Sequence, residues 1–119
     1  MINSYKDLDV WKKSIELVKK VYCTTKSFPK EEIYGLVNQM RRCAISIPSN
    51  IAEGKTRQHV NEYIQFLYIA LGSCAELESQ VIVAKELEYL NNGTEEEIIE
   101  GIENVGKMLR GLIKSLRRD

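Results

Sequence analysis

Residues 41–57 read RRCAISIPSNIAEGKTR and hold the feature that decides the fold, a proline inside a run of residues with helical spacing. Apolar residues recur every three or four positions across this run, which predicts one helix with a single apolar side. These residues are Leu36, Met40, Ala44, Ile47 and Ile51. Pro48 falls among them, and a proline inside a helix removes a hydrogen bond at a cost of roughly 3 kcal/mol. Because the apolar spacing keeps its phase across Pro48, the pattern predicts one helix kinked at the proline rather than two helices.

Small and polar residues surround the proline and complete a structural motif. They are Ser46, Ser49, Asn50, Glu53 and Gly54. A proline at position 48 leaves the carbonyl of Ala44 without its usual N–H donor. The side chain of Ser49 or Asn50, or a water molecule, is therefore expected to donate a hydrogen bond to that carbonyl.

Three further stripes of apolar residues keep the helical period. They comprise Leu8, Trp11, Ile15, Val18 and Tyr22; Tyr63, Leu67, Ala70, Cys74, Leu77, Val81 and Ala84; and Ile98, Ile102, Val105, Leu109, Leu112 and Leu116. Asn91-Asn92-Gly93 is a turn signal, and Thr94 followed by Glu97 is a capping box that predicts the start of the fourth helix. No segment alternates as a strand would, and the breaks between stripes are short. The sequence therefore predicts a single domain over residues 1–119, all-α, an antiparallel up-down-up-down four-helix bundle.

The sequence offers no group of residues suited to catalysis. His59 is the single histidine, so the paired Glu-x-x-His motifs of a di-metal bundle are excluded, and it is expected to be an exposed or capping residue. Cys23, Cys43 and Cys74 show no C-x-x-C pairing and are expected to be buried thiols in a reducing cytoplasm. We expect no catalytic site, no metal and no cofactor. The sequence starts with no signal-like apolar segment and has no membrane-length apolar run, so a cytoplasmic location away from membranes is predicted.

Positive charge is the remaining functional signal. Net charge is zero, yet residues 1–57 hold eleven Lys or Arg against six Asp or Glu, and residues 107–119 hold five against one. Candidate phosphate-binding residues are Arg41, Arg42, Lys55 and Arg57 around the motif, and Lys107, Arg110, Lys114 and Arg117 in the fourth helix. The last four follow a 3-4-3 spacing and share one side of that helix. Such a stripe is typical of sequence-independent nucleic-acid binding, but also of a solvated helix face that compensates the helix dipole.

With these residues in hand, the chain resembles the four-helix-bundle 23S rRNA intervening-sequence proteins. The resemblance runs through DLDVWKKSIELVKKVY (7–22), FPKEEIYGLVNQMRRCAISIPSNIAEG (28–54), FLYIALGSCAELESQ (66–80) and MLRGLIKSLRR (108–118). It implies a ring-shaped homopentamer, a cytoplasmic location and no known catalytic activity. Some relatives are encoded inside insertions in ribosomal RNA genes. A similar bundle occurs in the accessory protein of diversity-generating retroelements, which looks like a basic ring that binds nucleic acid.

Two functions follow as hypotheses. The first is a non-enzymatic oligomer that binds RNA or DNA, most plausibly structured RNA, through its basic helix faces. The second is a ring-shaped adaptor that binds a partner protein and uses its charges for subunit pairing. Tyr68, Ile69 and Ile82 either pack against another subunit or widen the core stripe. Tyr63, Phe66 and Tyr68 are expected in the core or an interface rather than as a base-stacking platform.

Overall fold

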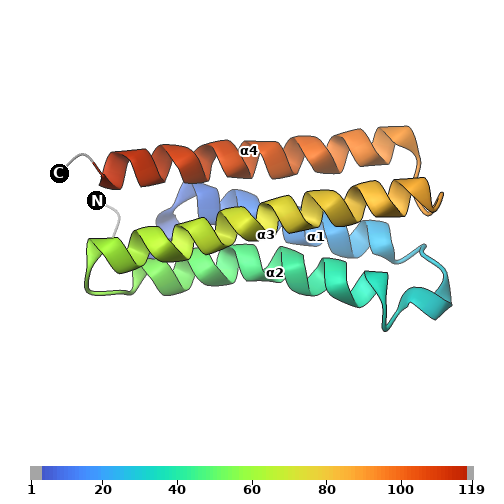
Figure 1. Ribbon diagram of the computed structural model, residues 1–119, viewed down its shortest axis with the longest axis horizontal. Coiled ribbons are helices and arrows are strands. Elements are labelled where there is room, and N and C mark those ends of the chain that lie inside the picture. Colours follow the sequence, from blue (N-terminus) through green and yellow to red (C-terminus); the bar gives the residue numbers. More distant parts are fainter. Residues whose placement is uncertain (1–3, 118–119) are drawn as a thin grey trace.

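The computed structural model describes residues 4–117, which form four long helices and two short 3-10 helices. In chain order these are η1 (Tyr5–Asp7), α1 (Asp9–Thr25), η2 (Lys30–Glu32), α2 (Leu36–Lys55), α3 (Val60–Glu86) and α4 (Asn92–Leu116). Figure 1 shows the long helices side by side, each pointing opposite to the one before it. No strand occurs within residues 4–117. The prediction of an all-α four-helix bundle is confirmed.

Each long helix packs against two neighbours, in the order α1, α2, α3, α4 and back to α1. Within the described residues no Cα atom of α2 lies within 8 Å of one of α4, so these two helices lie diagonally across the bundle and meet only through core side chains. Cations on α2 and cations on α4 therefore project from opposite corners of the molecule. Both helices terminate at the same end of the bundle (Figure 1).

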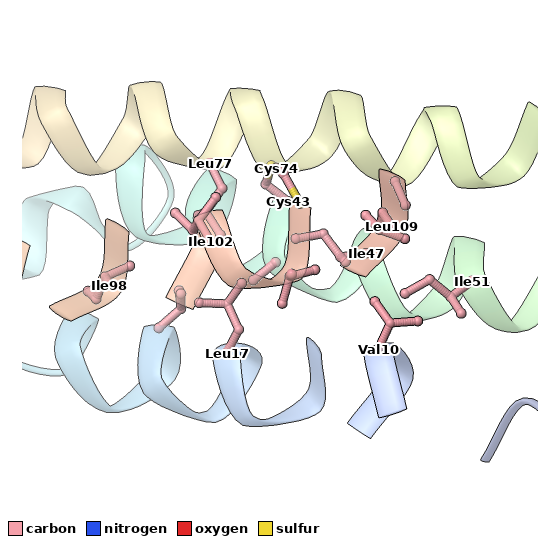
Figure 2. Close-up of a cluster of buried hydrophobic side chains, with 14 of the residues drawn as sticks. Val10, Leu17, Cys43, Ile47, Ile51, Cys74, Leu77, Ile98, Ile102 and Leu109 are labelled. Atoms are coloured by element: carbon pink, nitrogen blue, oxygen red, sulfur yellow. The ribbon is translucent and has the colours of Figure 1, made fainter. Parts of the chain in front are cut away.

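The core lies along the centre of the bundle and receives side chains from all four long helices (Figure 2). The predicted stripe of α2 is buried apart from the half-buried Leu36, and every residue of the predicted α3 stripe is buried. These two predictions are confirmed because heptad-like spacing holds one side of a long helix against its neighbours over many turns.

In the predicted stripe of the first helix, Leu8 just before α1 is buried as expected, but within α1 the stripe is displaced by one residue from the buried side. The buried residues of α1 are Val10, Ser14, Leu17, Val21 and Thr25. Trp11, Ile15, Val18 and Tyr22 are only half-buried. Because α1 packs against both α2 and α4, the side of α1 that faces the space between these two helices is buried. The polar residues Ser14 and Thr25 lie on this buried side, where their hydroxyls donate hydrogen bonds to the carbonyls of Trp11 and Val21.

The predicted start of the fourth helix is also wrong. The chain turns earlier, after Leu87, where Glu88 adopts a φ of 65°. Asn91 then caps α4, because its Oδ1 accepts a hydrogen bond of 2.8 Å from the backbone N–H of Thr94. Asn and Asp match Ser as N-cap residues, so Asn91 takes the role expected of Thr94. At the far end of α4, Ile113 is buried and Leu112 and Leu116 are half-buried.

Pro48 lies inside α2, which continues through it from Leu36 to Lys55. The bend expected at Pro48 stays a prediction. The side-chain hydrogen bond expected at the Ala44 carbonyl is made to another carbonyl in the structure. The Asn50 amide donates to the carbonyl of Ser46 at 2.7 Å, and Ser49 is exposed. Asn50 reaches the carbonyl one turn before it, whereas Ala44 lies six residues back.

Other residues of the motif bring α2 and α3 close together. The hydroxyls of Ser46 and Ser73 share a hydrogen bond of 2.6 Å, so Ser73 pairs across the helices and not with Glu76, which is exposed. A Cβ on Gly54 would lie 2.8 Å from the Cβ of Phe66, closer than side chains pack. The motif therefore acts as a contact between α2 and α3, in which small residues permit the close approach.

The length and composition of α3 would suffice to cross a membrane, the only such case among the described helices. This is weak support for a membrane span, because one side of α3 supplies much of the bundle core. Its other side carries most of the exposed large apolar side chains of the described chain. These are Val60, Tyr68, Ile69, Ile82, Val83 and Leu87. Tyr68, Ile69 and Ile82 are 45%, 52% and 47% exposed, so they do not widen the core stripe.

Candidate nucleic-acid interface

Arg41 is held in a contact between α1 and α2. Its Nε donates a hydrogen bond of 2.9 Å to the Thr25 hydroxyl, and its Nη2 donates one of 3.3 Å to the carbonyl of Tyr22. The guanidinium also lies 4.6 Å from the centre of the Tyr22 ring. With its donors directed at α1, Arg41 is a structural side chain rather than a free phosphate ligand.

The other three cations around the motif occupy different surroundings. Arg42 is exposed and lines a shallow groove between α2 and α3 that also contains Glu76. Lys55 lies 5.9 Å from the ring centre of Tyr63, and Arg57 lies 4.7 Å from that of Phe66. Arg57 also forms an ion pair of 3.0 Å with Glu53 on the preceding turn. Its charge is therefore partly compensated within α2.

The four cations of α4 stay free of acidic partners in the part of the chain that the structure describes. Lys107, Arg110, Lys114 and Arg117 are all exposed, and none forms an ion pair with an acid among residues 4–117. Ten residues at 1.5 Å per residue extend them over about 15 Å of one helix side. We call these four residues the α4 basic face.

The α4 basic face adjoins a groove with an aromatic wall. A hollow of about 320 Å³ between α3 and α4 is lined by Tyr68, Leu71, Arg110, Ile113, Lys114 and Arg117. We call it the Tyr68 groove. The guanidinium of Arg117 lies 5.4 Å from the centre of the Tyr68 ring. Arg117 thus lies close to the Tyr68 ring, and Arg110 and Lys114 line the same hollow.

Charge is also separated along the bundle. Figure 1 shows the ends of α2 and α4 and the start of α3 at one end of the molecule, where Lys55, Arg57, Lys114 and Arg117 lie. The opposite end holds η2, the end of α3 and the start of α4. Its acids are Glu31, Glu32, Glu86, Glu88, Glu95, Glu96 and Glu97. The same end also carries Lys26, Lys30 and Lys85, and the end with the four cations also carries Asp7, Asp9, Glu53 and Glu62. The end with the seven glutamates is therefore net negative and disfavours a polyanion.

Groups suited to nucleophilic or metal chemistry are not assembled in the described residues. His59 is exposed at the start of α3 and makes no side-chain capping bond. Burial raises the pKa of the Cys43 thiol to about 12 and that of the Cys74 thiol to about 11, so both stay protonated at neutral pH. Cys23 is exposed, which contradicts the expectation that all three thiols are buried. No group of three or more His, Cys, Asp or Glu side chains is placed to hold a metal ion within residues 4–117.

Sequence reasoning had counted Tyr68 among core or interface aromatics. The signal that separates it from Tyr63 was present in the spacing, because Tyr63 belongs to the buried α3 stripe and Tyr68 does not. Tyr63 is 8% exposed and Tyr68 is 45% exposed. The spacing could not show that α4 would place Arg117 beside the exposed Tyr68 side chain, with Arg110 and Lys114 lining the same hollow.

Comparison with known proteins agrees with the fold. A crystal structure of a protein of unknown function from the S23 ribosomal protein family of Bacteroides thetaiotaomicron superposes with a TM-score of 0.82 and 27% sequence identity. The match covers 88% of this chain and 95% of that one. No curated protein matches the chain. The family model described as 23S rRNA-intervening sequence protein matches residues 6–111. The chain therefore belongs to the 23S rRNA-intervening sequence protein family.

Proposed function

We propose that this protein is a non-enzymatic, cytoplasmic homo-oligomer that binds structured RNA through the α4 basic face. The observation that carries the proposal is the set of four exposed cations that no acid of the described chain neutralises. Cations left in this state bind phosphates by releasing the counterions condensed on the nucleic acid, which gives affinity without sequence preference.

RNA is preferred to DNA as the partner for one reason. The family description refers to a sequence that intervenes in 23S rRNA. Phosphate contacts by themselves do not separate the two polymers, since both carry the same charged backbone.

Oligomerisation is supported by the outer side of α3. Ile69, Ile82 and Val83 are between 47% and 52% exposed on one helix. Ile69 is separated from Ile82 and Val83 by about 20 Å along α3, and exposed apolar side chains of this kind supply contact area for another subunit. The homopentamer implied by the family resemblance would repeat the α4 basic face in each subunit. Linked copies of a weak site raise the overall affinity for one long RNA without any new contact.

The absence of an enzyme activity is part of the same proposal. Raised pKa values keep the Cys43 and Cys74 thiols protonated, and a protonated thiol is a poor nucleophile. His59, the residue best suited to proton transfer, is exposed and is held by no side-chain capping bond.

The experiment is a salt series. Fluorescence anisotropy of a labelled RNA hairpin with a single-stranded tail is measured between 50 and 200 mM KCl, concentrations over which phosphate binding weakens by orders of magnitude. We expect the logarithm of the association constant to fall linearly with the logarithm of the salt concentration. Absence of binding at low salt, or binding that does not respond to salt, would remove this proposal.

The outer side of α3 also favours a second function, a ring-shaped adaptor for a partner protein. Its exposed apolar residues would contact the partner, and the charge separation along the bundle would serve subunit pairing. Affinity purification from native cells separates the two functions. A defined protein that stays bound after nuclease treatment favours the adaptor, whereas RNA recovered in its place favours RNA binding.

A further inference from the structure

Tyr68 differs from Tyr63 and Phe66, two other aromatic side chains of α3 that have a cation nearby. Tyr63 lies under Lys55 but is only 8% exposed, and Phe66 lies under Arg57, which is already paired with Glu53. The Tyr68 residue is 45% exposed, and the cations that line its groove have no acidic partner within residues 4–117. More of Tyr68 than of Tyr63 is thus reachable from solvent, and a flat ligand would contact the ring beside the Arg117 guanidinium, which lies 5.4 Å from the ring centre.

The shape of the Tyr68 groove fits a base and its backbone. Leu71 and Ile113 give an apolar floor, the Tyr68 ring gives a wall, and Arg110, Lys114 and Arg117 border the same hollow. Aromatic side chains that stack on bases, beside cations that follow the backbone, are the usual construction of sites for single-stranded nucleic acid.

A second hollow of about 910 Å³ continues from this groove towards the start of α3. Tyr68 and Arg117 line both hollows, and Asn61 and Gln65 line only the larger one. Side-chain amides can donate to and accept from base edges. The larger hollow therefore offers room and hydrogen-bonding groups for a neighbouring nucleotide, next to the one that stacks on Tyr68.

We propose that the Tyr68 groove binds an unpaired nucleotide of RNA, with the base stacked on Tyr68 and the adjoining phosphates held by Arg110, Lys114 and Arg117. This inference rests on the proposed RNA binding and specifies its ligand class, looped or single-stranded RNA. Bases inside a duplex are stacked on each other and present no free face, whereas unpaired bases can be turned outward onto an aromatic ring.

The test compares a single-stranded RNA with a blunt duplex of equal total nucleotide number, using the full chain and three variants. Tyr68→Leu removes the ring, Tyr68→Phe keeps it, and Tyr34→Leu is the matched control at the acidic end, where Tyr34 is 92% exposed. We expect Tyr68→Leu to weaken single-strand binding by about 5- to 150-fold, the range given by loss of one stacked base. Tyr68→Phe and Tyr34→Leu should bind like the wild type, and duplex binding should not respond to any variant.

A 2-aminopurine base in the single strand reports stacking directly. Its fluorescence should be quenched on binding the wild type and Tyr68→Phe but not Tyr68→Leu. Equal affinity of the wild type for single strand and duplex, or unchanged single-strand binding by Tyr68→Leu, would overturn the inference. So would a change in the oligomer mass of Tyr68→Leu, measured by light scattering, because Tyr68 would then be a subunit contact.

The two proposals fail in different ways. A wild type that binds no RNA at low salt removes both. A wild type that binds RNA with normal salt dependence, but equally well with and without the Tyr68 ring, removes only the stacking site.

Discussion

Replacing the α4 basic face with glutamine gives the most direct test of the reasoning. The variant carries Lys107→Gln, Arg110→Gln, Lys114→Gln and Arg117→Gln, each at an exposed position without an ion pair in the described chain. Because these side chains are exposed and glutamine is a good helix former, α4 should keep its fold. What changes is the number of cations that can release counterions from RNA.

The magnitude follows from the number of cations. Each phosphate neutralised on a single strand contributes about −0.7 to the slope of log K against log salt, so four cations contribute about −2.8. For a fourfold rise in salt, this slope corresponds to a loss of affinity of about 50-fold in the wild type. We expect the slope of the variant to be less steep by about 2.8, with the largest loss of affinity at the lowest salt.

The assay is fluorescence anisotropy with a short single-stranded RNA, so that one groove is occupied at a time. The control variant removes the same charge elsewhere, through Lys12→Gln, Lys19→Gln, Lys26→Gln and Lys30→Gln, all exposed and without ion pairs in the described residues. If the control variant reduces the slope as much as the α4 variant does, net charge and not the α4 basic face governs binding. An α4 variant with the wild-type slope would equally refute the reasoning.

Three further predictions concern side chains that hold the bundle together. Arg41→Ala should lower the free energy of unfolding, measured by urea denaturation, by about 1–3 kcal/mol because its hydrogen bonds to α1 are lost. The salt dependence of RNA binding, measured by fluorescence anisotropy, should stay unchanged. Gly54→Ala should destabilise the folded protein by about 1–3 kcal/mol, because the new Cβ would lie 2.8 Å from the Cβ of Phe66. Gly111 has open space around it, so Gly111→Ala should stabilise the folded protein by about 0.5–1 kcal/mol in the same assay. The pKa of Glu32 is lowered, first by the hydrogen bond from the Tyr89 hydroxyl and then by the one from the Leu36 N–H. The ionised Glu32 therefore stabilises the fold at pH values above its unfolded-state pKa. This contribution is lost as the pH falls through the lowered folded-state pKa. Denaturation midpoints measured through that acid range should show a smaller loss of stability in Tyr89→Phe than in the wild type.

How far the sequence predicted the fold depended on the length of each apolar pattern. The α3 stripe keeps heptad-like spacing from Tyr63 to Ala84, and all of it is buried. On α1, the half-buried apolar side with Trp11 and Tyr22 lies beside the buried one, and the pattern alone could not separate them. The packing of α1 against its neighbours determines which of the two sides is buried. On the half-buried side, the Arg41 guanidinium of α2 lies over the Tyr22 ring.

The candidate site was predicted as a list of cations but not as a surface. Spacing along one helix correctly grouped the four residues of the α4 basic face, since the helical period fixes which residues share a side. It could not show that the Arg41 side chain binds Tyr22 and Thr25, residues nineteen and sixteen positions earlier. Nor could it show that α2 and α4 lie diagonally, which keeps their cations apart along most of the bundle.

The sequence by itself determined the number of long helices and the burial of the α2 and α3 stripes. It also established that only one histidine is present and where the positive charge lies along the chain. These properties depend on residue identity and on local periodicity, which a sequence states directly. Only the tertiary structure decided which cations remain free, which α1 side enters the core, and that Tyr68 lines one hollow together with three cations of α4. The physical reason is that a side chain is free or occupied according to groups far away in the sequence, and the packing of helices alone brings those groups together.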